Sequence, residues 1–75
     1  MSQRVYRETL RFTAFSDDGD EFTIVRYTVF HGTKGIEGTS RFQTDDGEAV
    51  NWVSKGQYHH VNLELDLFSD DPSAP

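Results

Sequence analysis

Three histidines are the side chains of this 75-residue chain best suited to metal binding or acid–base chemistry: His31, His59 and His60. Adjacent residues on a strand point to opposite faces, so His59 and His60 cannot readily bind one ion together. If His59 follows the phase of Val61, it points inward and His60 points to solvent. We therefore predict ordinary strand histidines and no metal site.

Two acidic segments, residues 16–20 and 44–48, share the order hydroxyl, Asp, Asp, Gly, acid. An EF-hand calcium loop needs oxygen ligands at its first, third and fifth positions and glycine at its sixth. Placing Gly19 or Gly47 at the sixth position makes Ala14 or Phe42 the first, and neither side chain binds calcium. The shared pattern instead predicts two hairpin turns of similar geometry.

No catalytic or cofactor motif is found in the sequence. The chain has no cysteine, no G-x-S-x-G elbow and no serine beside a histidine. Its paired carboxylates fall in turns or near the end of the chain, where nothing would raise one pKa. Residues 32–35 match the GXXG clamp of KH domains in letters, but that clamp joins two helices. We predict a protein that is not an enzyme and needs no cofactor.

Composition and charge narrow the classes of partner. The formal net charge of −6 opposes contact with phosphate backbones, so a nucleic acid is unlikely as a partner. No segment approaches the ~20 apolar residues of a membrane span, and residues 1–4 lack the apolar core of a signal peptide. We expect a cytoplasmic protein. A domain this small without disulfides is marginally stable, and homo-oligomerisation is one common aid.

The clearest element is a β-hairpin over residues 4–31. Apolar Tyr6, Leu10, Phe12 and Ala14 alternate with polar residues, as expected for a strand with one buried face. Asp18-Gly19 supplies the turn. The returning strand changes phase once, which predicts either a bulge near residues 24–26 or a strand covered on both faces.

The later segments predict further strands. Three glycines predict a mobile loop over residues 32–38, followed by a short strand at residues 39–43. Residues 47–55 favour a strand, with a short helix as the alternative. Alternating leucines predict one strand over residues 58–68, and residues 69–75 should form a flexible tail.

The fold predicted for residues 1–75 is a single, mainly β domain of about five antiparallel strands. It would be a meander or a small SH3-like or OB-like barrel. Outward-facing Arg7 and Arg11 would complement Glu64 and Asp66, so we expect the first and last strands to be neighbours.

The second half of the chain resembles a group of short, uncharacterised proteobacterial proteins. The resemblance is carried by short motifs: Asp46-Gly47, Val50-Asn51, Lys55-Gly56, Tyr58, Asp70-Asp71-Pro72 and Ala74-Pro75. It implies a bacterial source and a small β-rich domain. It implies no activity, and Trp52 and the His59-His60 pair are not part of the pattern.

Three classes of function follow, and the first is preferred. It is a module that binds a protein partner through a strand edge or an acidic or aromatic face. The second is an acidic inhibitor or nucleic-acid mimic that occupies a basic groove. The third is a weak binder of single-stranded nucleic acid, which would need a basic surface stripe. The candidate interaction residues are Lys34, Trp52, Glu64 and Asp66.

Overall fold

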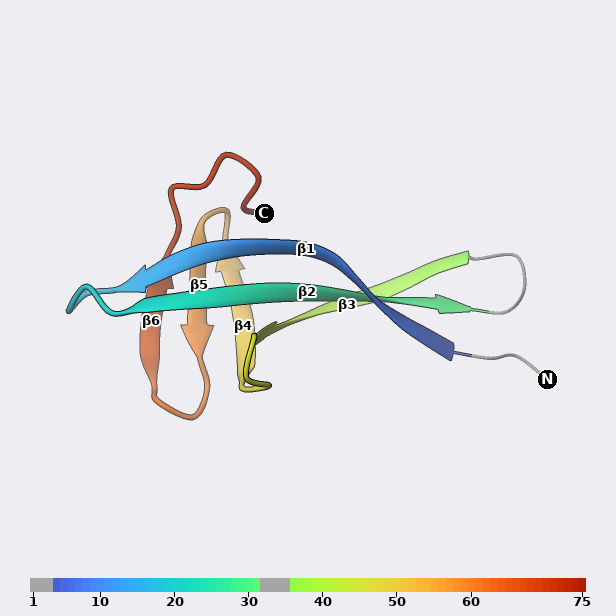
Figure 1. Ribbon diagram of the computed structural model, residues 1–75, viewed down its shortest axis with the longest axis horizontal. Helices are drawn as coiled ribbons and strands as arrows, with labels where there is room; N and C mark the ends of the chain where they lie inside the picture. Colours follow the sequence, from blue (N-terminus) through green and yellow to red (C-terminus); the bar gives the residue numbers. More distant parts are fainter. Residues whose placement is uncertain (1–3, 32–35) are drawn as a thin grey trace.

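The computed structural model describes residues 4–31 and 36–75, which form six antiparallel strands and no helix within those ranges. The strands pair in chain order and the last returns to the first, so the meander closes into a barrel (Figure 1). The prediction of a small, mainly β domain is confirmed. The strands are β1 (Arg4–Ser16), β2 (Glu21–His31), β3 (Ile36–Thr44), β4 (Ala49–Ser54), β5 (Gln57–His60) and β6 (Leu65–Phe68).

The two acidic turns have the same geometry, as the repeated sequence pattern predicts. In each turn, the first residue's N–H donates to the fifth residue's carbonyl, and the glycine N–H donates back to the first carbonyl. The hydroxyls of Ser16 and Thr44 accept from the N–H of the fifth residue. Gly19 and Gly47 have φ of 85° and 94°, a region that glycine adopts without steric cost.

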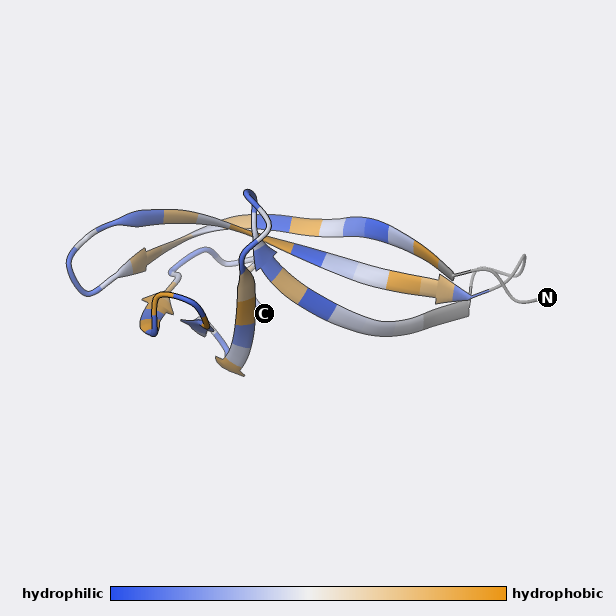
Figure 2. Cartoon of the chain, turned by 90° about the horizontal axis from the view of Figure 1, so that it is seen from below, coloured by the Kyte–Doolittle hydropathy of each residue, from blue (hydrophilic) through white to orange (hydrophobic). Residues whose placement is uncertain are grey.

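The barrel interior is filled by side chains from all six strands. Tyr58 is at its centre, with ring centroids 5.1 Å from Phe12 and 5.6 Å from Phe42. Apolar and polar residues alternate along the long strands, as expected when one sheet face is buried (Figure 2). The buried core cluster comprises Phe12, Ala14, Ile24, Val50, Tyr58, Leu67 and Ala74.

The last seven residues pack on the barrel, whereas the sequence predicts a flexible tail. Ala74 is 3% exposed and belongs to the core. The main-chain oxygen of Pro75 accepts hydrogen bonds from the Gly56 N–H at 3.0 Å, the Tyr58 hydroxyl at 2.5 Å and the Trp52 Nε1–H at 3.3 Å. This segment is polar and proline-containing, so its composition alone does not reveal these long-range contacts.

β1, β2 and β3 are longer than the other strands and extend beyond them as a three-stranded arm (Figure 1). We define the arm as residues 4–11, 26–31 and 36–41. It gives the molecule its elongated shape, with principal dimensions of 46 × 26 × 18 Å. The arm begins where the pairings to the short strands end, and these are Phe15–Phe68, Ser16–Leu67, Phe42–Val50 and Gln43–Ala49.

The first and last strands are neighbours, as predicted, but not through the expected charges. They pair at residues 15–16 and 67–68, near the tip of the first hairpin. Arg11 instead contacts Glu8 of its own strand at 2.9 Å, and Asp66 contacts His59 at 3.2 Å. Packing in the barrel therefore determines how β1 pairs with β6. It brings together other residues than those that the charge pattern indicates.

Three boundaries differ from the sequence predictions. The expected strand at 58–68 is divided between β5 and β6, because the chain turns at residues 61–64, where Glu64 has a φ of 53°. β3 begins at Ile36, so only residues 32–35 of the predicted mobile loop remain, and these are outside the described residues. Residues 49–54 form β4, which confirms the strand and excludes the helix alternative.

The predicted bulge near residues 24–26 is also displaced. The extra residue is Thr9 of β1, and a second irregularity lies between Thr28 and Phe30 in the pairing of β2 with β3. Ile24 and Val25 are both buried although they face opposite sides of the sheet. The alternative explanation of the phase change, that both faces are covered, is therefore the correct one.

Candidate functional site

The outer edge of β3 is open along the arm. β3 pairs with β2 along its length, but its pairing with β4 is confined to Phe42 and Gln43. Within the described part of the chain, no strand pairs with the other side of residues 36–41. An open edge presents unpaired backbone donors and acceptors to which another extended chain can add.

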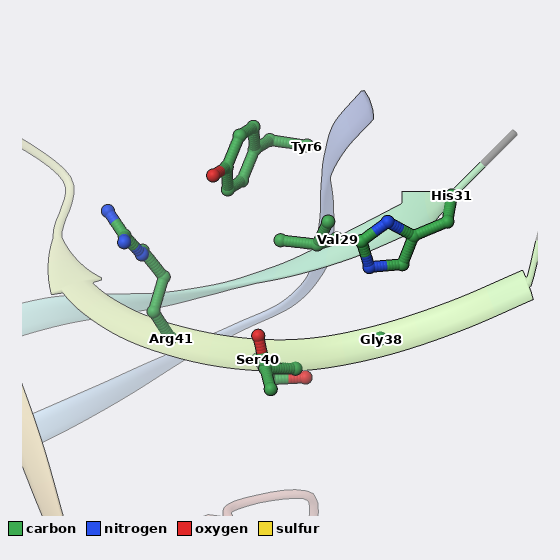
Figure 3. Close-up of a pocket in the computed structure, with 7 residues that line it drawn as sticks. Tyr6, Val29, His31, Gly38, Ser40 and Arg41 are labelled. Carbon is green, nitrogen blue, oxygen red and sulfur yellow. The ribbon is translucent and has the colours of Figure 1, made fainter. Parts of the chain in front are cut away.

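A groove lies beside this edge on one face of the arm. Tyr6 of β1 and Arg41 of β3 stand on either side of Val29 of β2 (Figure 3). The Arg41 guanidinium carbon is 5.7 Å from the Tyr6 ring centroid, within the range of a cation–π contact. We name the arm groove by its lining residues: Tyr6, Val29, His31, Gly38, Thr39, Ser40 and Arg41.

The arm groove encloses about 510 Å³, within the range of ~300–1,000 Å³ typical of ligand sites. Val29 is 7% exposed, whereas Tyr6 is 50% exposed. A second hollow of about 240 Å³ lies on the other side of the Tyr6–Arg41 contact and reaches Tyr27 and Gln43. The cation–π pair therefore separates two hollows on the same sheet face.

The His31 imidazole lies across Gly38, at the end of the groove away from Arg41 (Figure 3). A Cβ atom at Gly38 would be 2.7 Å from His31 Nε2 and 3.2 Å from the Val29 carbonyl oxygen. A Cβ atom 2.7 Å from the ring would displace it, so the ring position requires glycine here. The imidazole fills the space over Gly38 that a side chain would otherwise occupy.

Hydroxyl groups on the opposite face of the arm hold its three strands together. The Thr28 hydroxyl is 2.9 Å from both the Thr9 and Ser40 hydroxyls, so one chain of hydrogen bonds crosses β1, β2 and β3. Arg26 Nε–H donates to Thr9 Oγ1 at 2.9 Å. Arg7 lies over the Phe30 ring at 5.9 Å. These contacts support the backbone that underlies the groove.

Charge is segregated along the molecule. Five of the seven lysines and arginines belong to the arm by sequence: Arg4, Arg7, Arg11, Arg26 and Arg41. The arm contains two of the thirteen acidic residues, Glu8 and Glu37. A side-chain hydrogen bond from Arg11 lowers the pKa of Glu8, and partial desolvation opposes this effect. The rest of the chain carries eleven acidic residues, so the basic character of the arm is not apparent from the net charge.

The structure does not gather the predicted interaction residues into one site. Lys34 lies outside the described residues. Trp52 is 54% exposed near the β4–β5 turn, whereas Glu64 lies in the turn between β5 and β6 (Figure 1). Asp66 is exposed on β6 and contacts His59 Nδ1 at 3.2 Å.

The histidine orientation is the reverse of the prediction. His60 is 2% exposed, its ring is 5.6 Å from Phe22, and its Nδ1 accepts a hydrogen bond from the Leu63 N–H. His59 is half-buried. The prediction assumed that Val61 continues the strand, but β5 ends at His60. Within residues 4–31 and 36–75, no group of three His, Asp or Glu side chains is placed to hold a metal ion.

Sequence reasoning missed the arm groove. Tyr6, His31 and Arg41 come from three strands, and their side chains meet only because β1 and β3 flank β2. The local signal was Gly38, a glycine that continues a strand where a loop was expected.

Comparisons with family models, with curated proteins and with solved structures found no match. No helix in the described part of the chain is long and apolar enough to cross a membrane.

Proposed function

We propose that this protein is a small interaction module that binds an extended segment of a partner protein along the edge of β3. The observation that carries the proposal is the open edge at residues 36–41 beside the arm groove. Strand addition obtains affinity from main-chain hydrogen bonds and specificity from pockets that receive alternate side chains. The edge and the groove together supply both features.

The supporting geometry is specific to β3. The outer edge of β1 is also unpaired over most of its length, because β6 reaches only Phe15 and Ser16. However, β3 contributes residues 38–41 to the groove lining, with the Ser40 hydroxyl turned to the opposite face, whereas β1 contributes Tyr6 alone among the described residues. A strand added to β3 would therefore have its side chains next to the larger hollow.

The test is selection from an unbiased random-peptide display library, followed by NMR mapping of the selected peptides. We expect shifts and new hydrogen-exchange protection at the amides of residues 36–41, with smaller effects in β4 and β5. Trp52→Phe is the control, because Trp52 is exposed and lies outside the arm. Peptides that instead perturb the Trp52 indole and the β4–β5 amides would contradict the proposal, as would a selection without enrichment.

Binding of single-stranded nucleic acid is the second candidate, favoured by the arginines and tyrosines of the arm. Tyr6 and Tyr27 could stack on bases while Arg41 contacts phosphate. The eleven acidic residues outside the arm oppose this role, because a nucleic acid longer than the arm would approach them. Titration with oligothymidylate at low salt tests it, and saturable shifts at Tyr6, Tyr27 and Arg41 would support it.

The acidic-inhibitor alternative has less support. Its acidic residues are distributed over turns, strand ends and the C-terminal segment on different sides of the barrel, at residues 17–21, 45–48, 64–66 and 70–71 (Figure 1). A mimic of nucleic acid needs a continuous acidic face. We retain a binding role without catalysis, and a cytoplasmic location, as parts of the proposal.

A further inference from the structure

Gly38 lies at the end of the arm groove, next to the edge of β3. The His31 ring covers it and fills the space that a side chain at this position would occupy. Neighbouring strands are ~4.8 Å apart, and directly opposed Cβ atoms are ~5 Å apart. A side chain of an added strand that lies opposite Gly38 would therefore contact the His31 ring.

Arg41 lies at the other end of the groove. Its guanidinium extends over the Tyr6 ring, and its N–H groups can still bind a carboxylate in the plane of the guanidinium. Side chains two residues apart on a strand share a face and are ~6.7 Å apart. One extended ligand can thus offer a carboxylate to Arg41 and place a neighbouring side chain on the same face, toward the His31 ring.

We propose that the arm groove recognises an extended acidic peptide that adds to the edge of β3 and pairs a carboxylate with Arg41. This inference rests on the proposed function and specifies its partner. Charge complementarity supports an acidic ligand, because the described lining of the groove includes Arg41 and no carboxylate. A second copy that used the same groove would bring no lining carboxylate to Arg41.

A short peptide also fits the charge distribution better than a nucleic acid does. The Debye length is ~8 Å at physiological ionic strength, whereas the molecule is 46 Å long. A ligand confined to the arm is thus screened from the acidic residues at the far end of the barrel. A peptide additionally supplies the backbone donors and acceptors that the edge of β3 requires.

The experiment compares two display libraries that differ only in fixed alternate positions, which are Asp or Glu in one and Lys or Arg in the other. We expect enrichment from the acidic library alone. The best acidic peptide is then measured against Arg41→Glu, with Lys55→Glu as the matched control. Both substitutions change the net charge equally, and Lys55 is exposed outside the arm.

Arg41→Glu should weaken binding about 10- to 100-fold, the range expected for a lost charge-assisted hydrogen bond. Lys55→Glu should change it less than about twofold. A peptide with Lys in place of the acidic residue opposite Arg41 should bind Arg41→Glu better than it binds the native protein. This gain of binding cannot result from a loss of stability in the variant.

Three results would overturn the acidic-peptide assignment. The first is equal or better enrichment from the basic library. The second is an acidic peptide that binds Arg41→Glu and Lys55→Glu alike. The third is oligothymidylate that displaces the acidic peptide from the same amides and binds more tightly. If an unbiased library yields neutral ligands at residues 36–41, only this inference fails. If it yields none at this edge, the proposed function fails as well.

Discussion

Tyr58→Phe tests whether the C-terminal segment stabilises the barrel. The substitution keeps the ring that packs on Phe12 and Phe42 and removes only the hydroxyl, which donates to the Pro75 oxygen at 2.5 Å. That oxygen still accepts from the Gly56 N–H. Because the acceptor is not left unsatisfied, the cost should be near the net value of one hydrogen bond, about 1 kcal/mol.

The free energy of unfolding can be measured by urea denaturation, and the melting temperature by calorimetry. About 1 kcal/mol corresponds to a decrease of ~4–8 °C for a domain of this size. Tyr27→Phe is the control, since Tyr27 lies on the arm and makes no hydroxyl hydrogen bond among the described residues. A change under about 0.3 kcal/mol for Tyr58→Phe would refute the reasoning. So would a loss of about 3–5 kcal/mol, the range for deletion of a whole ring.

The Tyr58 hydroxyl should also make the stability of the native protein depend on pH. Burial raises the pKa of Tyr58 above the ordinary value of 10.0, although a backbone hydrogen bond from Gly56 partly opposes this. Below pH 10 the hydroxyl is protonated in both the folded and unfolded states, so it contributes no slope. Above pH 10 the unfolded state loses the proton first, and the native protein loses stability as pH rises. The difference in free energy of unfolding between the native protein and Tyr58→Phe should therefore shrink above pH 10. A difference that grows there would contradict the burial of the hydroxyl.

Three further substitutions test the tail, a turn and the arm. Ala74→Asp buries a carboxylate in the core and should cost more than about 2 kcal/mol by urea denaturation, whereas Ser73→Asp, on an exposed neighbour, should be nearly neutral. Gly47→Ala should cost about 1 kcal/mol through its φ of 94° alone, because no atom lies within 4 Å of the added Cβ; a larger loss would indicate a clash. Thr28→Val should cost about 1–2 kcal/mol and speed amide exchange in the arm more than in the barrel, and uniform exchange would contradict the bridging role of this hydroxyl.

The local features of the fold could be predicted because short-range chemistry determines them. The turns at residues 16–20 and 44–48 depend on a hydroxyl, a glycine and a five-residue spacing, all of which are contiguous in the sequence. The strand character of residues 4–16 follows from alternation within one segment. These predictions agree with the structure because no distant residue is needed to decide them.

The errors at residues 58–68 and at the two neighbouring histidines have a common physical cause, which is that alternation does not reveal where a strand stops. Val61, Leu63, Leu65 and Leu67 alternate without a break, yet the chain turns at residues 61–64 and the first two of these side chains are exposed. The turn changes the phase that was used to orient His59 and His60. Closure of the barrel stabilises a short β5 and a short β6. This stabilisation arises only from packing against other strands.

The sequence by itself determined a small acidic β protein with two equivalent hairpin turns, a central set of aromatic residues and a glycine at position 38. Only the tertiary structure decided that β1 and β3 flank β2 beyond the barrel, so that Tyr6 and Arg41 meet over Val29. It also decided that the arginines gather on the arm while the acidic residues lie mostly elsewhere. Pairing between strands far apart in the chain fixes which side chains become neighbours, and that pairing depends on the energy of the whole packed sheet.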